Sequence, residues 1–389
     1  MHKIIGSITG YIKKTDHWLW LFTLVATLFG ILTLLSMKLS MGWTWSKIGM
    51  VTQVGAAFLG VVGAFILSQI DYHVLVRLWK IYTPLVYGAV IVMYFLIGTD
   101  WVGGQQGNYN WFLIPLGGGR QLSIQPSEFL KLVFILNYSM HISIVKENIN
   151  RPLYLAVLLI HAAIPAGLIH LLGDDGTALI FIIIAVVMLI ANGLSWMYIV
   201  AGLLVIAIAL PVAWKLDIIK DYQKIRIIAI YRPELLEEKA LSDAVFQQDK
   251  GLISMGIGGA TGGGFVLENA FAVPYMLNDF VFTYIGQFVG FIGCLVVIAI
   301  LTAIVFKCLM DARRSTTPLG RGICAGVFGF FAAQIIINLG MCLKVLPVIG
   351  VPLPFFSQGG TAMLVDWLAI GLVLSVYSHN STPLFKMHH

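Results

Sequence analysis

Three acidic side chains stand out because apolar residues surround them. Asp279 opens one apolar run, and Glu128 begins another, three residues before Lys131. Asp366 lies inside the last apolar stretch of the chain. A carboxylate inside a bilayer costs about 2.5–3.5 kcal/mol on insertion scales, so such acids usually face a cavity or a partner. For Asp279, at the edge of its run, we predict a general base at the lipid–water boundary.

Each of these acids also has a structural explanation. Asp is a favoured N-cap residue, so Asp279 alone is equally consistent with capping its helix. Glu128 and Lys131 are spaced to share one helix face, and an ion pair that fixes the helix end is favoured over direct catalysis. Asp366 is consistent either with a cavity-lining acid or with a polar contact between helices.

Two loop segments add further candidates. Residues 215–232 alternate basic and apolar side chains, as in Lys224 and Arg226, which is typical of an amphipathic helix on a bilayer surface. Residues 251–264 contain seven glycines, including Gly258 and Gly259. Such a segment can cradle a phosphate with backbone N–H groups, although the sequence alone favours a flexible loop.

A proline-rich segment precedes the last apolar stretch. Residues 347–354 hold three prolines, which forbid a regular helix. Apolar neighbours indicate that the segment re-enters the membrane edge, where broken backbone must be buried in protein or line a cavity. Ser357 and Gln358 follow in the turn into the final helix.

The composition of the chain indicates whether these residues lie in a soluble protein or in a membrane protein. The chain has 389 residues, 59% hydrophobic and 11% charged, whereas soluble domains carry about 25% charged residues. This excludes an ordinary soluble enzyme, a disordered chain and a disulfide scaffold. Its four cysteines form no CxxC pair and have no accompanying histidine cluster, so we expect no metal site built from them.

A span needs about 20 mostly apolar residues, and we predict an all-α bundle of about ten transmembrane helices. Residues 1–389 form one polytopic domain, with a large extracytoplasmic loop at 215–278 between helices seven and eight. The predicted spans are 17–36, 48–69, 78–98, 127–146, 153–171, 176–192, 196–214, 279–306, 321–343 and 361–378.

Lys and Arg set the orientation. With a cytoplasmic N-terminus, inside segments hold twelve of them and short outside loops hold four. Because basic residues favour the cytoplasmic side, both termini are predicted to be cytoplasmic. The first apolar stretch is too long for a cleavable signal and lacks a small-residue cleavage site. No internal repeat of the kind common in transporters is found.

Several of these motifs together resemble the SEDS family (shape, elongation, division and sporulation), which includes RodA, FtsW and SpoVE. The resemblance runs from about residue 17 to 378 and depends mainly on QPSE and the proline block. Its motifs, in order, are Trp111, QPSEFLK at 125–131, DDGTA at 174–178, GIGG at 256–259, DFVF at 279–282 and GVPLPFFSQGG at 350–360.

The resemblance implies a ten-helix peptidoglycan glycosyltransferase that polymerises lipid II at the outer face of the cytoplasmic membrane. In that family, Asp279 would deprotonate the 4-hydroxyl of the acceptor sugar, and undecaprenyl pyrophosphate would leave from the donor. Positive charge on the leaving group would come from Lys224 and Arg226, or from a divalent cation such as Mg or Mn. The residues expected to bind substrate are Glu128, Lys131, Lys224, Arg226, Gly258, Gly259, Ser357, Gln358 and Asp366.

The same resemblance implies that the protein acts in the membrane with a class B penicillin-binding protein as its partner. It implies no binding of nucleic acid. The chain departs from the family pattern around the predicted site, so altered activity and a non-catalytic scaffold stay open. A flippase for lipid-linked precursors is a further alternative, with Glu128, Lys131 and Asp366 lining its groove. The departures are Asn110, Gly173, Lys250, the segment 275–278, Gln287, Phe288, Gln358 and Asp366.

Overall fold

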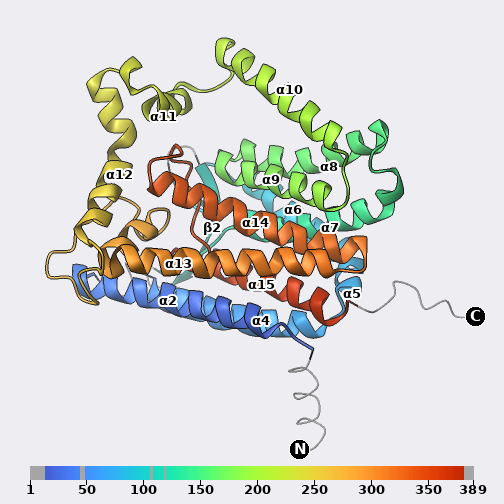
Figure 1. Ribbon diagram of the computed structural model, residues 1–389, viewed down its shortest axis with the longest axis horizontal. Helices are drawn as coiled ribbons and strands as arrows, with labels where there is room; N and C mark the ends of the chain where they lie inside the picture. Colours follow the sequence, from blue (N-terminus) through green and yellow to red (C-terminus); the bar gives the residue numbers. More distant parts are fainter. Residues whose placement is uncertain (1–13, 44–48, 106–107, 118–119, 381–389) are drawn as a thin grey trace, which may run out of the picture.

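The computed structural model describes residues 14–43, 49–105, 108–117 and 120–380, and helices dominate these residues (Figure 1). Within these ranges, eight helices are long and apolar enough to cross a membrane. They are α2 (His17–Met41), α4 (Met50–Gln69), α7 (Pro126–Val145), α8 (Pro152–Leu171), α10 (Trp196–Lys215), α13 (Val281–Arg314), α14 (Pro318–Cys342) and α15 (Gly360–Ser378).

Two shorter apolar helices lie where the other two spans were predicted, namely α6 (Trp79–Phe95) and α9 (Asp175–Ala191). The helical membrane fold is therefore confirmed, while the count of ten crossings stays a prediction. The terminal segments 1–13 and 381–389, which carry part of the charge bias used for orientation, lie outside the described residues.

Local sequence marks several helix ends. The Asp16 carboxylate caps α2 by accepting hydrogen bonds from the backbone amides of Trp18 and Leu19 at 3.0 and 3.1 Å. Proline opens α7 at Pro126, where its missing N–H costs nothing. The Thr317 hydroxyl caps α14. These caps hold the helix ends on which the polar clusters are built.

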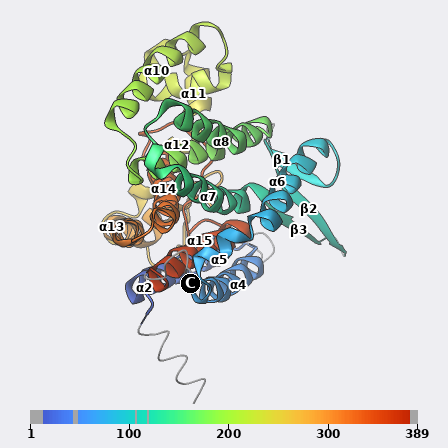
Figure 2. The same cartoon turned by 90° about the vertical axis from the view of Figure 1, so that its right-hand side faces the viewer.

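The core of the bundle centres on α14, which packs against α7, α9 and α13. On another side, α15 packs closely on α4 because small residues let the two backbones approach, with Gly60 against Trp367 and Gly371 against Ala64. In contrast, α10 has no buried residue and stands apart from the bundle in both views (Figures 1 and 2). Such a helix is suited to contact with lipid on all sides.

A three-stranded antiparallel sheet follows α6, a feature that the all-α prediction did not include. It consists of β1 (Val102–Gln105), β2 (Asn108–Gly117) and β3 (Arg120–Ile124), in the order β1-β2-β3. Val102 pairs with Phe112, and Leu113 pairs with Ser123. Figure 2 shows the strands projecting from the side of the bundle beside α6. The backbone amide of Tyr109 joins the sheet to the end of α8 by donating to Leu172 O at 3.0 Å.

The segment 215–278 is largely helical. It contains α11 (Asp221–Tyr231), the 3-10 turn η2 (Pro233–Leu235) and α12 (Glu238–Ile257). The glycine-rich turn that follows docks against a break in α13 at Gly290, where φ is 69°. The remaining short elements are α5 (Tyr72–Arg77) and the 3-10 turn η1 (Lys146–Asn148).

Candidate active site

Asp279 lies in the turn before α13, and its carboxylate does not cap that helix. The N-cap residue is Phe280, with no side-chain capping hydrogen bond. The main-chain carbonyl of Asp279 accepts a hydrogen bond from Asn338 Nδ2 at 2.7 Å, and this amide also donates to Val351 O at 2.8 Å. At Gly350, a Cβ would lie 3.6 Å from Asp279 Oδ2. These hydrogen bonds fix the backbone at Asp279. Because its carboxylate does not cap α13, helix capping does not explain this residue.

Its surroundings raise the pKa of Asp279 to about 6. Burial is the main cause, because removal from water disfavours the charged carboxylate. The nearby negative charge of Asp174 raises the pKa further. A carboxyl group with this pKa is mostly ionised at neutral pH and still has appreciable proton affinity, which suits a general base.

Asp174 is the acid that we did not predict as a site residue. It is buried just before α9, where its Oδ1 accepts from the Thr177 amide at 2.9 Å and its Oδ2 accepts from Asn110 Nδ2 at 2.6 Å. Burial raises its pKa, and the hydrogen bonds from Thr177 oppose that rise. The available signal was its position in the DDGTA motif at the start of an apolar run.

Glu128 and Lys131 form the predicted ion pair, buried inside the bundle. Lys131 Nζ lies 2.8 Å from Glu128 Oε1, and the side chains are 0% and 3% exposed, respectively. The ammonium group also lies 4.5 Å from the Phe330 ring centroid. Glu128 Oε2 has no hydrogen-bond partner within the described part of the chain. Charges of this pair act on both Asp174 and Asp366, so the structure brings four predicted or newly found polar residues into one electrostatic network.

Asp366 fixes the proline-rich segment from within the bundle. Its Oδ2 accepts a hydrogen bond from the backbone amide of Phe355 at 3.1 Å. Phe355 has a φ of 66°, in the left-handed region that bulky residues rarely adopt. The contact is therefore from helix to loop rather than the helix-to-helix contact considered from the sequence.

Ser357 and Gln358 clasp the chain just before Asp279. Ser357 Oγ donates to Asn278 O at 2.5 Å, and the backbone N–H of Gln358 donates to Leu277 O at 2.7 Å. In return, Asn278 Nδ2 donates to Gln358 O at 2.8 Å. Their predicted contact with substrate stays a prediction, while their observed contacts position the Asp279 turn.

The two basic candidates of α11 have different surroundings. Arg226 donates to Val348 O at 3.0 Å, two residues before Gly350, and so reaches the loop that faces Asp279. Lys224 forms an ion pair with Asp217, and its Nζ lies 3.9 Å from Asp221 Oδ1. Of the two, Arg226 is the one that the structure connects to the Asp279 loop.

The glycine-rich turn packs tightly against α13. A Cβ on Gly258 would lie 1.9 Å from Gly286 O, and one on Gly262 would lie 2.3 Å from Phe288 O. The amides of Gly258 and Gly259 donate to carbonyls within the same turn. Close backbone approach therefore explains Gly258 and Gly262, and a positive φ of 55° explains Gly259. The amides of Gly258 and Gly259 are occupied by these hydrogen bonds, which the phosphate-cradle hypothesis did not foresee.

The donor atoms in this region limit how a metal ion is held. Among the described residues, no group of three or more His, Cys, Asp or Glu side chains is placed to bind a metal. Asp174 and Asp279 are two buried carboxylates, and the charge of Asp174 acts on Asp279. A magnesium-type ion typically takes one or two carboxylates together with substrate phosphates, so these residues fit an ion that is completed by the substrate.

Comparison with known proteins identifies the architecture that carries this site. The family model for FtsW, RodA and SpoVE cell cycle proteins matches residues 16–382. The chain belongs to the FtsW/RodA/SpoVE family. It is 27% identical over 353 residues to the peptidoglycan glycosyltransferase MrdB of Escherichia coli K12, covering 86% of this chain and 88% of that one.

A further relative agrees with this membership, and two solved structures share the fold. A probable peptidoglycan glycosyltransferase FtsW of Taylorella equigenitalis is 30% identical over 287 residues, covering 71% of this chain and 75% of that one. A solved structure on the coordination of polymerization and crosslinking by a peptidoglycan synthase complex matches with a TM-score of 0.74 at 23% identity, covering 95% and 99% of the two chains. Thermus thermophilus RodA matches with a TM-score of 0.64 at 21% identity, covering 95% and 98%.

Proposed function

We propose that this family member is a membrane glycosyltransferase that polymerises lipid II into glycan strands for cell elongation, division or sporulation. One observation carries the proposal. The Asp279 carboxylate caps no helix, and burial together with the charge of Asp174 raises its pKa to about 6. Relatives named as peptidoglycan glycosyltransferases along most of the chain support the same reaction class.

In the proposed step, Asp279 takes the proton from the 4-hydroxyl of the acceptor sugar. The freed oxygen forms a bond to the anomeric carbon of the donor, and the bond from that carbon to the pyrophosphate breaks. Undecaprenyl pyrophosphate leaves with the bonding electrons, and the proton on Asp279 passes to solvent. Arg226 supplies positive charge near the leaving group, and Asp174 and Asp279 are the groups that would hold a divalent cation there.

We place the site at the outer face of the bacterial cytoplasmic membrane and both termini in the cytoplasm. The excess of Lys and Arg in the predicted inside segments supports this orientation. We also propose a class B penicillin-binding protein as the transpeptidase partner. A related solved fold is described as a synthase complex that couples polymerization to crosslinking, which supports such pairing.

The test is glycan polymerisation from purified lipid II in detergent. We expect Asp279→Asn to lower the rate by about 10²–10⁴-fold, the typical contribution of a general base. Asp243→Asn, an exposed acid on α12, is the matched control and should retain the wild-type rate. Equal polymer yield from the Asp279 variant and wild type would remove the catalytic assignment.

A second candidate, a flippase for lipid-linked precursors, is favoured by one observation. Glu128, Lys131 and Asp366 are ionisable side chains buried inside the bundle, an expensive arrangement that often marks a transport path. Movement of labelled lipid II across vesicles that requires Glu128 but not Asp279 would favour this function over polymerisation.

A further inference from the structure

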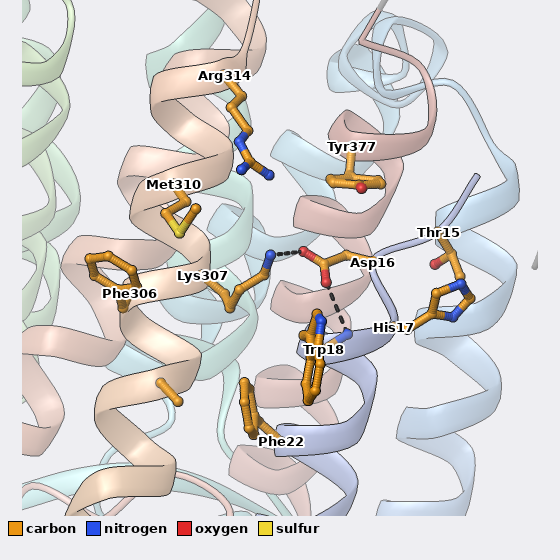
Figure 3. Close-up of a pocket in the computed structure, with 11 residues that line it drawn as sticks. Thr15, Asp16, His17, Trp18, Phe22, Phe306, Lys307, Met310, Arg314 and Tyr377 are labelled. Atoms are coloured by element: carbon orange, nitrogen blue, oxygen red, sulfur yellow. Dashed lines mark hydrogen bonds and ion pairs between the residues drawn. The ribbon is translucent and has the colours of Figure 1, made fainter. Parts of the chain in front are cut away.

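A second polar cluster lies at the opposite end of α13 from Asp279, where the start of α2 and the end of α15 meet it. Lys307 Nζ lies 2.5 Å from Asp16 Oδ2 (Figure 3). Asp311, one turn further along α13, is 3% exposed, and neither of its carboxylate oxygens has a hydrogen-bond partner among the described residues. Asp16, Lys307 and Arg314 are the charged groups that act on Asp311. None of this cluster takes part in the proposed glycosyl transfer.

Two adjoining cavities open onto this cluster. The first, of about 540 Å³, has cationic Lys307 and Arg314 on its wall and Phe22, Phe306 and Met310 as its apolar lining. The second, of about 400 Å³, is lined by Asp311, Arg314, Val376, Tyr377 and Asn380. Arg314 and Tyr377 line both cavities, and Figure 3 shows them on facing helices above the Asp16–Lys307 pair.

The charged side chains around the two cavities determine which kind of ligand can bind there. Lys307 and Arg314 act on Asp311 electrostatically but donate no hydrogen bond to it, and a buried carboxylate left without donors is costly, so Asp311 calls for a ligand with N–H donors. The Arg314 side chain lines both cavities, is exposed and forms no ion pair within the described part of the chain, so it is available to bind an anion there. Asp311 and Asp16 would repel a purely anionic ligand, and Lys307 and Arg314 would repel a purely cationic one.

We propose that these cavities bind the headgroup of a zwitterionic phospholipid with a primary ammonium, that is, a phosphoethanolamine lipid. The phosphate lies against Arg314 in the shared wall, and the ammonium donates to Asp311 in the second cavity. One acyl chain lies along Phe22 and Phe306 in the first cavity. Trp18, 60% exposed at the start of α2, is suited to the headgroup level of a bilayer.

Native mass spectrometry of the full chain in detergent tests this site. The protein is titrated with phosphatidylethanolamine, phosphatidylcholine and phosphatidylglycerol of matched acyl chains. We expect retention of the ethanolamine lipid to exceed that of the other two by about tenfold, since only it supplies a charge-assisted N–H donor. Asp311→Asn should abolish this preference, and Arg314→Gln should weaken retention of all three lipids. Arg313→Gln, exposed on the same turn and in neither cavity, should behave as wild type.

Three outcomes would overturn the proposal. Equal retention of the three lipids by wild type would remove the selective site. A preference for phosphatidylglycerol would indicate an anion site in which Asp311 has no part. An ethanolamine preference that survives in Asp311→Asn, in protein whose thermal unfolding matches wild type, would remove the assigned contact. The exposed Arg314→Gln variant, which leaves the interior unchanged, tests the phosphate contact separately from folding.

Discussion

The two ends of α13 both bring carboxylates out of water, but the surrounding chain treats them differently. Before the helix, Asp279 is fixed through its main-chain carbonyl, and the nearby charge that affects it belongs to another acid, Asp174. At the far end, Asp16 caps a helix and pairs with Lys307. At the far end an ion pair neutralises Asp16 and leaves only Asp311 of the acids there without a hydrogen-bond partner, whereas at the first end the acidic neighbour Asp174 raises the proton affinity of Asp279. A buried acid therefore becomes a candidate base through its neighbours rather than through burial alone.

Backbone order differs between the same two ends. The first part of α13 is broken at Gly290, where the glycine-rich turn inserts, and the loop at Ser357 and Gln358 holds the residue before Asp279 by hydrogen bonds. The far end is a continuous helix up to Arg314. The proposed catalytic end thus has a broken backbone held by distant loops, whereas the far end is an unbroken helix that the start of α2 and the end of α15 meet.

The largest effect should come from breaking the ion pair on the Asp279 side of the comparison. Lys131→Met leaves Glu128 buried without its partner and should lower the free energy of unfolding by about 3–5 kcal/mol. Lys307→Met at the far end should cost less, about 1–3 kcal/mol, because buried Asp16 keeps its hydrogen bonds from the backbone amides of Trp18 and Leu19. Thermal or denaturant unfolding in detergent measures both.

The double variant Glu128→Gln/Lys131→Met is the control, because it removes both charges together. Its stability should lie above that of Lys131→Met alone. A smaller loss for Lys131→Met than for Lys307→Met would contradict the contrast between the two ends.

A moderate effect should follow from filling the glycine turn at the broken end of α13. Gly262→Ala places a methyl group 2.3 Å from Phe288 O in a residue with φ of +81°. It should lower the free energy of unfolding by about 1–3 kcal/mol through backbone strain. Gly256→Ala, with nothing within 4 Å of the added carbon, is the matched control. That control should be neutral or stabilising by up to about 1 kcal/mol, and equal losses in both variants would refute the packing explanation.

The smallest effect is a shift in pH dependence. Polymerisation should rise as the pH increases through about 6, because the Asp279 base works only when deprotonated. Asp174→Asn removes a neighbouring negative charge, so the pKa of Asp279 should fall and the acidic limb should move to lower pH by up to about one unit. The measurement is the initial rate as a function of pH. If the acidic limb of this profile does not move in Asp174→Asn, the charge of Asp174 does not affect the pKa of Asp279.

Much of the helical architecture was predictable because hydropathy is a local property. The apolar runs at 17–36, 196–214 and 279–306 each fall on a helix of sufficient length. The sheet at 102–124 was missed because its strands are stabilised by pairing with one another and by contact with Leu172, which apolar counting does not register. The ion pair of Glu128 and Lys131 was predictable from spacing along one helix.

By itself, the sequence determined the environment, the apolar helices and the family motifs, because composition and short-range spacing decide each of them. Only the tertiary structure decided which charged groups act on one another. Asp174 lies 105 residues before Asp279, and Asp16 lies 291 residues before Lys307, so these interactions depend on how the helices pack. The physical reason is that a carboxylate's proton affinity and partners are set by charges and burial within a few ångströms, wherever in the chain those charges originate.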